Sequence, residues 1–149
     1  MNTQQVQDTI TREIEIDAPL AVVWELVSRP GWWINDGTIV DNPIEERDGV
    51  FHVTNSTHGT FPLLVESSTE PTHIAFRWAP WDERAVESGN TLVEFFLEGE
   101  ADGPVTVRVV ESGFSVIQRD ADQVAETYRE NESGWEAELG ALKSAVERR

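Results

Sequence analysis

The stretch EIEIDAPLAVVWELVSRPGWW, residues Glu13–Trp33, changes its apolar spacing halfway. Its first residues alternate isoleucine with glutamate, and the alternation extends back to Thr9. A period of two predicts a half-buried β-strand over Thr9–Ile16. Its buried face would carry Ile10, Ile14 and Ile16.

After Asp17 the apolar residues recur at helical spacing, at Leu20, Val23, Trp24 and Val27. Asp17 is a candidate N-cap, and Pro19 fits the first helical turn. Pro30-Gly31 is a helix-terminating pair. The sequence therefore predicts a short helix that ends just before the adjacent tryptophans Trp32 and Trp33.

Five further segments read as half-buried antiparallel strands joined by turns. They are Gly49–Asn55, Thr60–Ser67, Thr72–Trp78, Asn90–Glu100 and Gly103–Ser112. The predicted inward residues are Ile74, Phe76, Trp78, Val93, Phe95, Leu97, Val105, Val107 and Val109. From Asp120 the period becomes helical, with an apolar stripe of Trp135, Leu139, Leu142 and Val146. This order favours an α+β fold in which a long C-terminal helix lies across a curved antiparallel sheet.

The composition argues against several classes of partner and location. The 149 residues suit one domain, 1–149, and carry a formal net charge of −17. That charge argues against nucleic acid and anionic membrane surfaces as partners. There is no cysteine, no secretory signal and no apolar run of about 20 residues. We expect a cytoplasmic protein without membrane insertion, as a monomer or weak dimer.

Four motifs resemble those of START-like, Bet v 1-like (SRPBCC) domains, in the branch named for the activator of Hsp90 ATPase. They are REIEIDAPLAVVWELV, HGTFPLLVESSTEPTHIAFRW, TLVEFFLEGEADGPVTVRVVESGF and ESGWEAELGALKSAVE. Together they extend from about Thr9 to Glu147. The resemblance implies a helix-grip fold, with a cavity between the sheet and the terminal helix. Members bind hydrophobic molecules, cyclise polyketides, protect antibiotic producers or assist Hsp90. The eukaryotic co-chaperone has a further N-terminal domain, whereas only eight residues precede the first strand here.

The candidate ligand-binding residues are mostly aromatic. They are Trp32, Trp33, Phe61, Phe76, Trp78, Trp81, Phe95, Glu111, Trp135 and Leu139. The family has a short second helix at the cavity mouth, where Trp32 and Trp33 fall. These two residues are interpreted either as a wall of that mouth or as a staple between helix and sheet. Phe76 and Phe95 are interpreted either as cavity wall or as plain core.

Glu111 is the carboxylate of most interest. It ends the last strand, where it lies either on the surface or in a bulge, or turns into the cavity. In the cavity its pKa would rise, and it could serve as an acid or a ligand anchor. No catalytic residue is assigned. His52, His58 and His73 lack metal-pair spacing, so neither a metal nor another cofactor is expected. Gly134 and Gly140 suggest either close backbone approach or room for another group.

Three functions follow. The first is binding, with sequestration or self-resistance as the purpose, of an aromatic or polycyclic hydrophobic molecule. The second is a cyclase- or hydrolase-type enzyme that uses Glu111 or a histidine. The third is a module that binds a chaperone partner through an apolar patch, where Leu92 and Phe96 share a face with Glu94 and Glu98.

Overall fold

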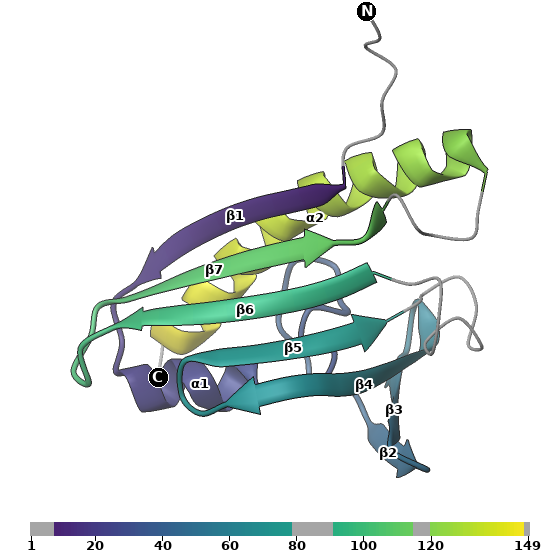
Figure 1. The fold of residues 1–149 in the computed structure, drawn as a ribbon. Coiled ribbons are helices and arrows are strands. Elements are labelled where there is room, and N and C mark those ends of the chain that lie inside the picture. Colours follow the sequence, from purple (N-terminus) through teal and green to yellow (C-terminus); the bar gives the residue numbers. More distant parts are fainter. Residues whose placement is uncertain (1–7, 79–90, 115–119, 148–149) are drawn as a thin grey trace, which may run out of the picture.

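The computed structural model describes residues 8–78, 91–114 and 120–147. Seven strands and two helices follow one another along these residues (Figure 1). In chain order they are β1 (Thr9–Ile16), α1 (Leu20–Val27), β2 (Ile44–Arg47), β3 (Val50–Asn55), β4 (Gly59–Thr69), β5 (His73–Trp78), β6 (Thr91–Gly99), β7 (Val105–Ser112) and α2 (Ala121–Glu147).

The strands form one antiparallel sheet in the order β1-β7-β6-β5-β4-β3-β2. Sequential neighbours pair throughout except for β1, which lies beside the last strand, with Ile16 opposite Val105. Helix α2 runs along one face of the curved sheet, and α1 lies near the C-terminal end of α2 (Figure 1). The result is the α+β helix-grip fold that the sequence predicts.

The predicted alternation places the core correctly. Val93, Phe95 and Leu97 of β6 are buried, as are alternate residues of β7 from Val105 to Glu111. The apolar stripe of α2 is buried against them, at Trp135, Leu139, Leu142 and Val146. The core therefore lies between the concave face of the sheet and α2.

Two local predictions are wrong. Strand β2 was missed because all four of its residues are exposed, so it has no apolar alternation. Asp17 is not the cap of α1, whose N-cap is Pro19 without a side-chain hydrogen bond. Asp17 instead donates its backbone N–H to Glu147 Oε2 at 2.8 Å, which ties the start of α1 to the end of α2.

Gly31 explains how the chain turns after α1. Its φ is +70°, and a Cβ at this position would lie 3.0 Å from both methyl groups of Val53. Only glycine fits that backbone and that space. Residues 30–33 form turns rather than a second helix, and the tight turn directs Trp32 and Trp33 into the core.

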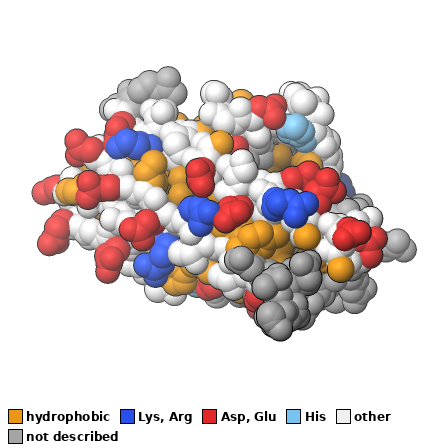
Figure 2. Space-filling model, turned by 90° about the horizontal axis from the view of Figure 1, so that it is seen from above, with side chains coloured by type: hydrophobic (Ala, Val, Ile, Leu, Met, Phe, Trp, Pro, Cys, Tyr) orange, Lys and Arg blue, Asp and Glu red, His pale blue; other side chains and the backbone are white. Residues whose placement is uncertain are grey.

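Acidic side chains outnumber basic ones, 28 to 11. Figure 2, viewed from above Figure 1, shows carboxylates spread over this face with a few basic side chains between them. Arg12 of β1 pairs with Glu132 and Glu136 of α2 at 2.7 and 3.3 Å. Exposed pairs of this kind contribute little stability each, about 0–1 kcal/mol. They do neutralise part of the charge where α2 meets the edge strand.

Candidate functional site

Trp33 is the centre of an aromatic cluster. Its ring centroid lies 5.4 to 5.6 Å from those of Phe76, Trp78, Phe95 and Trp135. Rings from the post-α1 turn, β5, β6 and α2 therefore meet at one residue. Offset and edge-to-face contacts at these spacings are attractive beyond simple burial. The cluster belongs to the hydrophobic core of the protein.

The two adjacent tryptophans differ in role. Trp32 is 2% exposed and packs on Phe95 at 5.4 Å, which makes it a staple between the turn and the sheet. Trp33 is 5% exposed and also lines a pocket at the surface. Trp32 therefore fits the interpretation as a staple between helix and sheet, whereas Trp33 fits the interpretation as part of a pocket wall.

The pocket has a volume of about 170 Å³. Trp33, Trp78 and Trp135 form its aromatic wall, and the remaining lining residues are Asn35, Glu130, Asn131, Gly134 and Glu138. An apolar cavity of about 150 Å³ holds one benzene molecule. The pocket thus has room for a single ring, whereas sites for drug-sized ligands occupy about 300 Å³ or more.

Glu111 lies beneath this pocket and is completely buried. Its Oε1 accepts hydrogen bonds from Trp135 Nε1 at 2.8 Å and Asn131 Nδ2 at 3.0 Å. Its Oε2 accepts from Thr91 Oγ1 at 2.6 Å, and from Trp78 Nε1 and Asn131 Nδ2 at 3.1 Å. The carboxyl group therefore joins β5, β6, β7 and α2.

The interpretation of Glu111 as a surface or bulge residue is wrong. It continues the inward alternation of β7, two residues after Val109. Burial raises the pKa of Glu111, while the hydrogen bonds from Thr91, Trp135, Trp78 and Asn131 lower it and offset part of the rise. Glu111 does not line the pocket. Its geometry is that of a support for Trp78 and Trp135.

Glu138 is the acid that does line the pocket. It is 8% exposed, and its Oε1 has no hydrogen-bond partner among the described residues. Burial raises the pKa of Glu138 to about 7, and the charge of Asp36 adds to the rise. Hydrogen bonds from the Gly37 backbone and the Asn35 side chain oppose it. The group titrates close to neutral pH, which exposed carboxylates do not.

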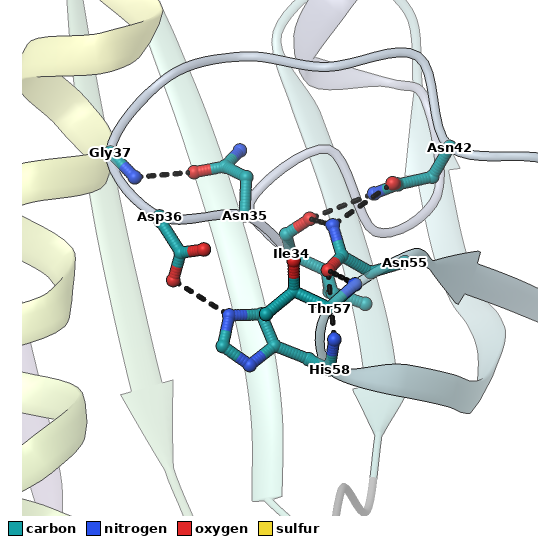
Figure 3. A network of polar contacts seen from close by, with 8 residues as sticks. All are labelled: Ile34, Asn35, Asp36, Gly37, Asn42, Asn55, Thr57 and His58. Carbon is teal, nitrogen blue, oxygen red and sulfur yellow. Dashed lines mark hydrogen bonds and ion pairs between the residues drawn. The ribbon is translucent and has the colours of Figure 1, made fainter.

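A polar network holds the segment that faces Glu138 (Figure 3). Asn55 Nδ2 donates to the Ile34 carbonyl at 3.1 Å, and Asn42 donates to the same oxygen at 2.8 Å. His58 Nε2 lies 2.6 Å from Asp36 Oδ1. Gly37 N–H donates to Asn35 Oδ1 at 2.9 Å. Segment 34–42 is thereby fixed against the β3–β4 turn.

The other predicted ligand-binding residues have different surroundings. Phe76, Phe95 and Leu139 are buried in the core, and none of them lines the pocket. Phe61 is half-buried, 6.4 Å from the ring of Trp78. Trp81 lies outside the described residues.

The helix glycines make no close contacts. A Cβ at Gly134 or at Gly140 would meet nothing within 4 Å. Close backbone approach, one of the two sequence-based interpretations, is therefore wrong for both. Gly134 lines the pocket, so the room it leaves is pocket volume.

The outer face of the sheet is less apolar than the sequence suggested. Leu92 and Phe96 are both only half-exposed. The guanidinium of Arg108 lies 4.9 Å above the Phe96 ring, and the His73 ring is 4.7 Å away. His73 also contacts Glu94 at 2.9 Å. This surface is therefore a mixed polar face rather than an open apolar patch.

Sequence reasoning missed three polar residues of the site: Thr91, Asn131 and Glu138. A signal existed for Glu138, which stands three residues after Trp135 and four before Leu142, on the predicted apolar stripe. Asn131 precedes Trp135 by four residues on the same stripe. Thr91 continues the inward alternation of Val93, Phe95 and Leu97, but no sequence pattern pairs it with Glu111 on the neighbouring strand.

Within residues 8–78, 91–114 and 120–147, no cluster of histidine and carboxylate side chains could hold a metal ion. In the same residues, neither helix combines the length and apolar character needed to cross a bilayer.

Solved structures of other proteins share the fold, among them these three. Protein MLL2253 from Mesorhizobium loti superposes with a TM-score of 0.68 at 19% identity, covering 94% of this chain and 97% of that one. The Aha1 dimer from Colwellia psychrerythraea gives 0.63 at 18%, covering 94% and 96%. DynU16, a protein in the dynemicin biosynthetic locus, gives 0.63 at 20%, covering 95% of this chain but 48% of its own. At these identities the likeness shows the fold alone.

Comparison of the sequence with curated proteins found no match. The family model described as "Activator of Hsp90 ATPase homolog 1-like protein" matches residues 17–147, which include α1, all strands from β2 to β7, and α2. The chain therefore belongs to the activator of Hsp90 ATPase homolog 1-like family.

Proposed function

We propose that this protein binds a small molecule by enclosing a single-ring apolar group in the three-tryptophan pocket. The observation that carries the proposal is the wall of Trp33, Trp78 and Trp135 around about 170 Å³, at the junction of α2 and the sheet. The volume narrows the sequence-based expectation of a polycyclic ligand to one ring or a group of similar size. A cytoplasmic location remains part of the proposal.

The wall is pre-formed, which favours binding. Trp78 and Trp135 each donate their indole N–H to the buried Glu111, at 3.1 and 2.8 Å. Neither ring can turn without breaking a hydrogen bond to a group that has no access to water. A rigid site loses less conformational entropy when the ligand arrives. Glu111 serves the proposed function as a support for the walls.

Binding fits the geometry better than catalysis by Glu111. Each oxygen of this carboxyl group already accepts at least two hydrogen bonds from the protein. An acid or base must reach the proton of its substrate directly or through one water molecule. Glu111 is fully buried and outside the pocket lining, so a ligand in the pocket does not touch it.

The expected affinity sets the range of the experiment. A single ring that buries about 150 Å² of apolar area gains about 4 kcal/mol at 25 cal/mol per Å². Since association also costs translational and rotational freedom, a ligand without a polar anchor is expected to have a dissociation constant of about 1 mM at best. Tryptophan fluorescence titrations with single-ring and polycyclic aromatics should therefore extend to several millimolar.

Two matched variants locate the binding. Gly134→Leu puts a side chain into the pocket, while Gly140→Leu places the same side chain on α2 outside the pocket lining. We expect saturable quenching in the wild type and in Gly140→Leu, and its loss in Gly134→Leu with unchanged circular dichroism. Quenching that persists in Gly134→Leu would place the site elsewhere. A flat response from the wild type across the panel would refute the proposal.

A further inference from the structure

The polar groups around the pocket differ in availability. The Trp78, Trp135 and Asn131 donors all point at Glu111. The Asn35 amide group donates to the Trp32 carbonyl at 3.0 Å, and its oxygen accepts from Gly37. These donors are engaged inside the protein. Among the described lining residues, a ligand that offers acceptors, such as a carboxylate, would find one unpartnered donor, Trp33 Nε1, and no lysine or arginine.

An acceptor, by contrast, is available. The Gly37 backbone and the Asn35 side chain reach the Glu138 carboxyl group, but its Oε1 is buried and has no hydrogen-bond partner among the described residues. A buried oxygen without a donor costs free energy, which a proton or a donor from a ligand removes. Trp33 Nε1 is the one lining donor in the same condition.

The charges around the pocket all have one sign. Glu130 and Glu138 line it, and no lysine or arginine does so among the described residues. Asp36 lies close enough to Glu138 to raise its pKa, and Glu111 lies beneath the wall. Asp36 is in contact with His58, whose Nε2 lies 2.6 Å from Asp36 Oδ1. The protein as a whole carries a formal charge of −17, which attracts cations over longer range.

The aromatic wall suits the same kind of ligand. The rings of Trp33 and Trp78 are nearly perpendicular, at 86°, and those of Trp33 and Trp135 are inclined at 50°. Rings of different inclination present their faces from more than one direction. Tryptophan faces attract cations, ammonium groups included, and do so more strongly where water is excluded.

We propose that the ligand carries a compact organic ammonium group, which pairs with Glu138 while its apolar part lies against the three tryptophans. The inference rests on the binding site proposed above and adds the chemical class of the ligand. Glu138 is its anchor, and Glu130 at the exposed rim attracts the cation without being buried with it.

Three compounds with one ring and one small substituent test this. They are benzylamine, which stays protonated between pH 5.5 and 8, benzyl alcohol, which is neutral, and benzoate, which is an anion. At pH 8 and low salt we expect benzylamine to bind at least tenfold more tightly than benzyl alcohol, and benzoate to bind more weakly than both. Thermal shift and fluorescence titration give the affinities.

Two variants test whether Glu138 causes the preference for benzylamine. Glu138→Gln keeps the side-chain shape, and we expect it to remove the advantage of benzylamine while benzyl alcohol binds as before. Glu126→Gln removes an exposed carboxylate of α2 outside the pocket lining; it is the control and should change either affinity less than about threefold. For the wild type, lowering the pH from 8 to 5.5 should weaken benzylamine at least tenfold and leave benzyl alcohol unchanged, because Glu138 gains a proton.

The outcomes separate the two proposals. If benzyl alcohol binds as tightly as benzylamine at pH 8, the ammonium inference is overturned and the binding site stands. An unchanged benzylamine affinity in Glu138→Gln also overturns it. If none of the three compounds binds, the proposed function fails together with the inference.

Discussion

Replacing Glu138 by glutamine should change how the stability of this protein depends on pH. Burial raises the pKa of Glu138 from 4.5 to about 7. The folded protein therefore prefers the protonated form, whereas the unfolded chain ionises near pH 4.5. Stability associated with this group is complete below pH 4.5 and is lost as the pH rises through 7.

The size of the effect follows from the two pKa values. Each unit of difference corresponds to about 1.4 kcal/mol, so ionisation of Glu138 costs the folded protein about 3 kcal/mol by pH 8. Glutamine cannot ionise. Relative to the wild type, Glu138→Gln should therefore gain about 3 kcal/mol in free energy of unfolding between pH 4 and pH 8.

Urea unfolding at pH 4, 5, 6, 7 and 8 measures this difference for both proteins. Subtracting the wild-type curve removes the contributions of the other carboxylates, which the two proteins share. Glu130→Gln provides the control, because it removes an exposed carboxylate from the same helix. A Glu138→Gln curve parallel to the wild type, within about 0.5 kcal/mol, would refute our account of the buried carboxyl group.

Four further substitutions test the packing and the hydrogen bonds. Gly134→Ala and Gly140→Ala should each raise the free energy of unfolding by up to about 1 kcal/mol, measured in urea, because the new methyl group meets no atom within 4 Å; a loss of stability would contradict the open space at either position. Phe95→Ala should lower the free energy of unfolding by about 3–5 kcal/mol, since Phe95 is completely buried among the tryptophans. A loss below about 1 kcal/mol in thermal or urea unfolding would show that the cluster is loosely packed. Thr91→Val should lower the free energy of unfolding by about 1.5–3 kcal/mol, because it removes the 2.6 Å hydrogen bond to the buried Glu111 and keeps the shape of the side chain. An unchanged unfolding midpoint would mean that this hydrogen bond adds no net stability.

The sequence alone predicts most of the secondary structure. Alternation over Thr9–Ile16 and along β5, β6 and β7, and the 4-3-4 spacing from Trp135 to Val146, identify strands and helix correctly. These patterns are local, because the period of burial belongs to a single element. Strand β2 escapes prediction for the same reason, since an edge strand exposed along its length has no such period.

The site depended on tertiary structure. Alternation along β7 was visible up to Val109, yet the burial of Glu111 required four donors from β5, β6 and α2 that no local pattern contains. The adjacent tryptophans remained ambiguous in the sequence. A glycine turn with φ +70° directs both of them inward, and their neighbours are distant in the chain.

Glu138 illustrates which properties of a residue the sequence predicts and which depend on tertiary structure. Its position on the apolar stripe of α2 follows from the sequence, because helical spacing fixes which residues share a face. Its raised pKa does not, since that depends on burial and on Gly37, Asn35 and Asp36, from a segment about 100 residues earlier. The sequence by itself determined which residues share each face of each element. Tertiary packing determined which polar groups lose their water and which partners they find, because desolvation depends on every element that closes around a group.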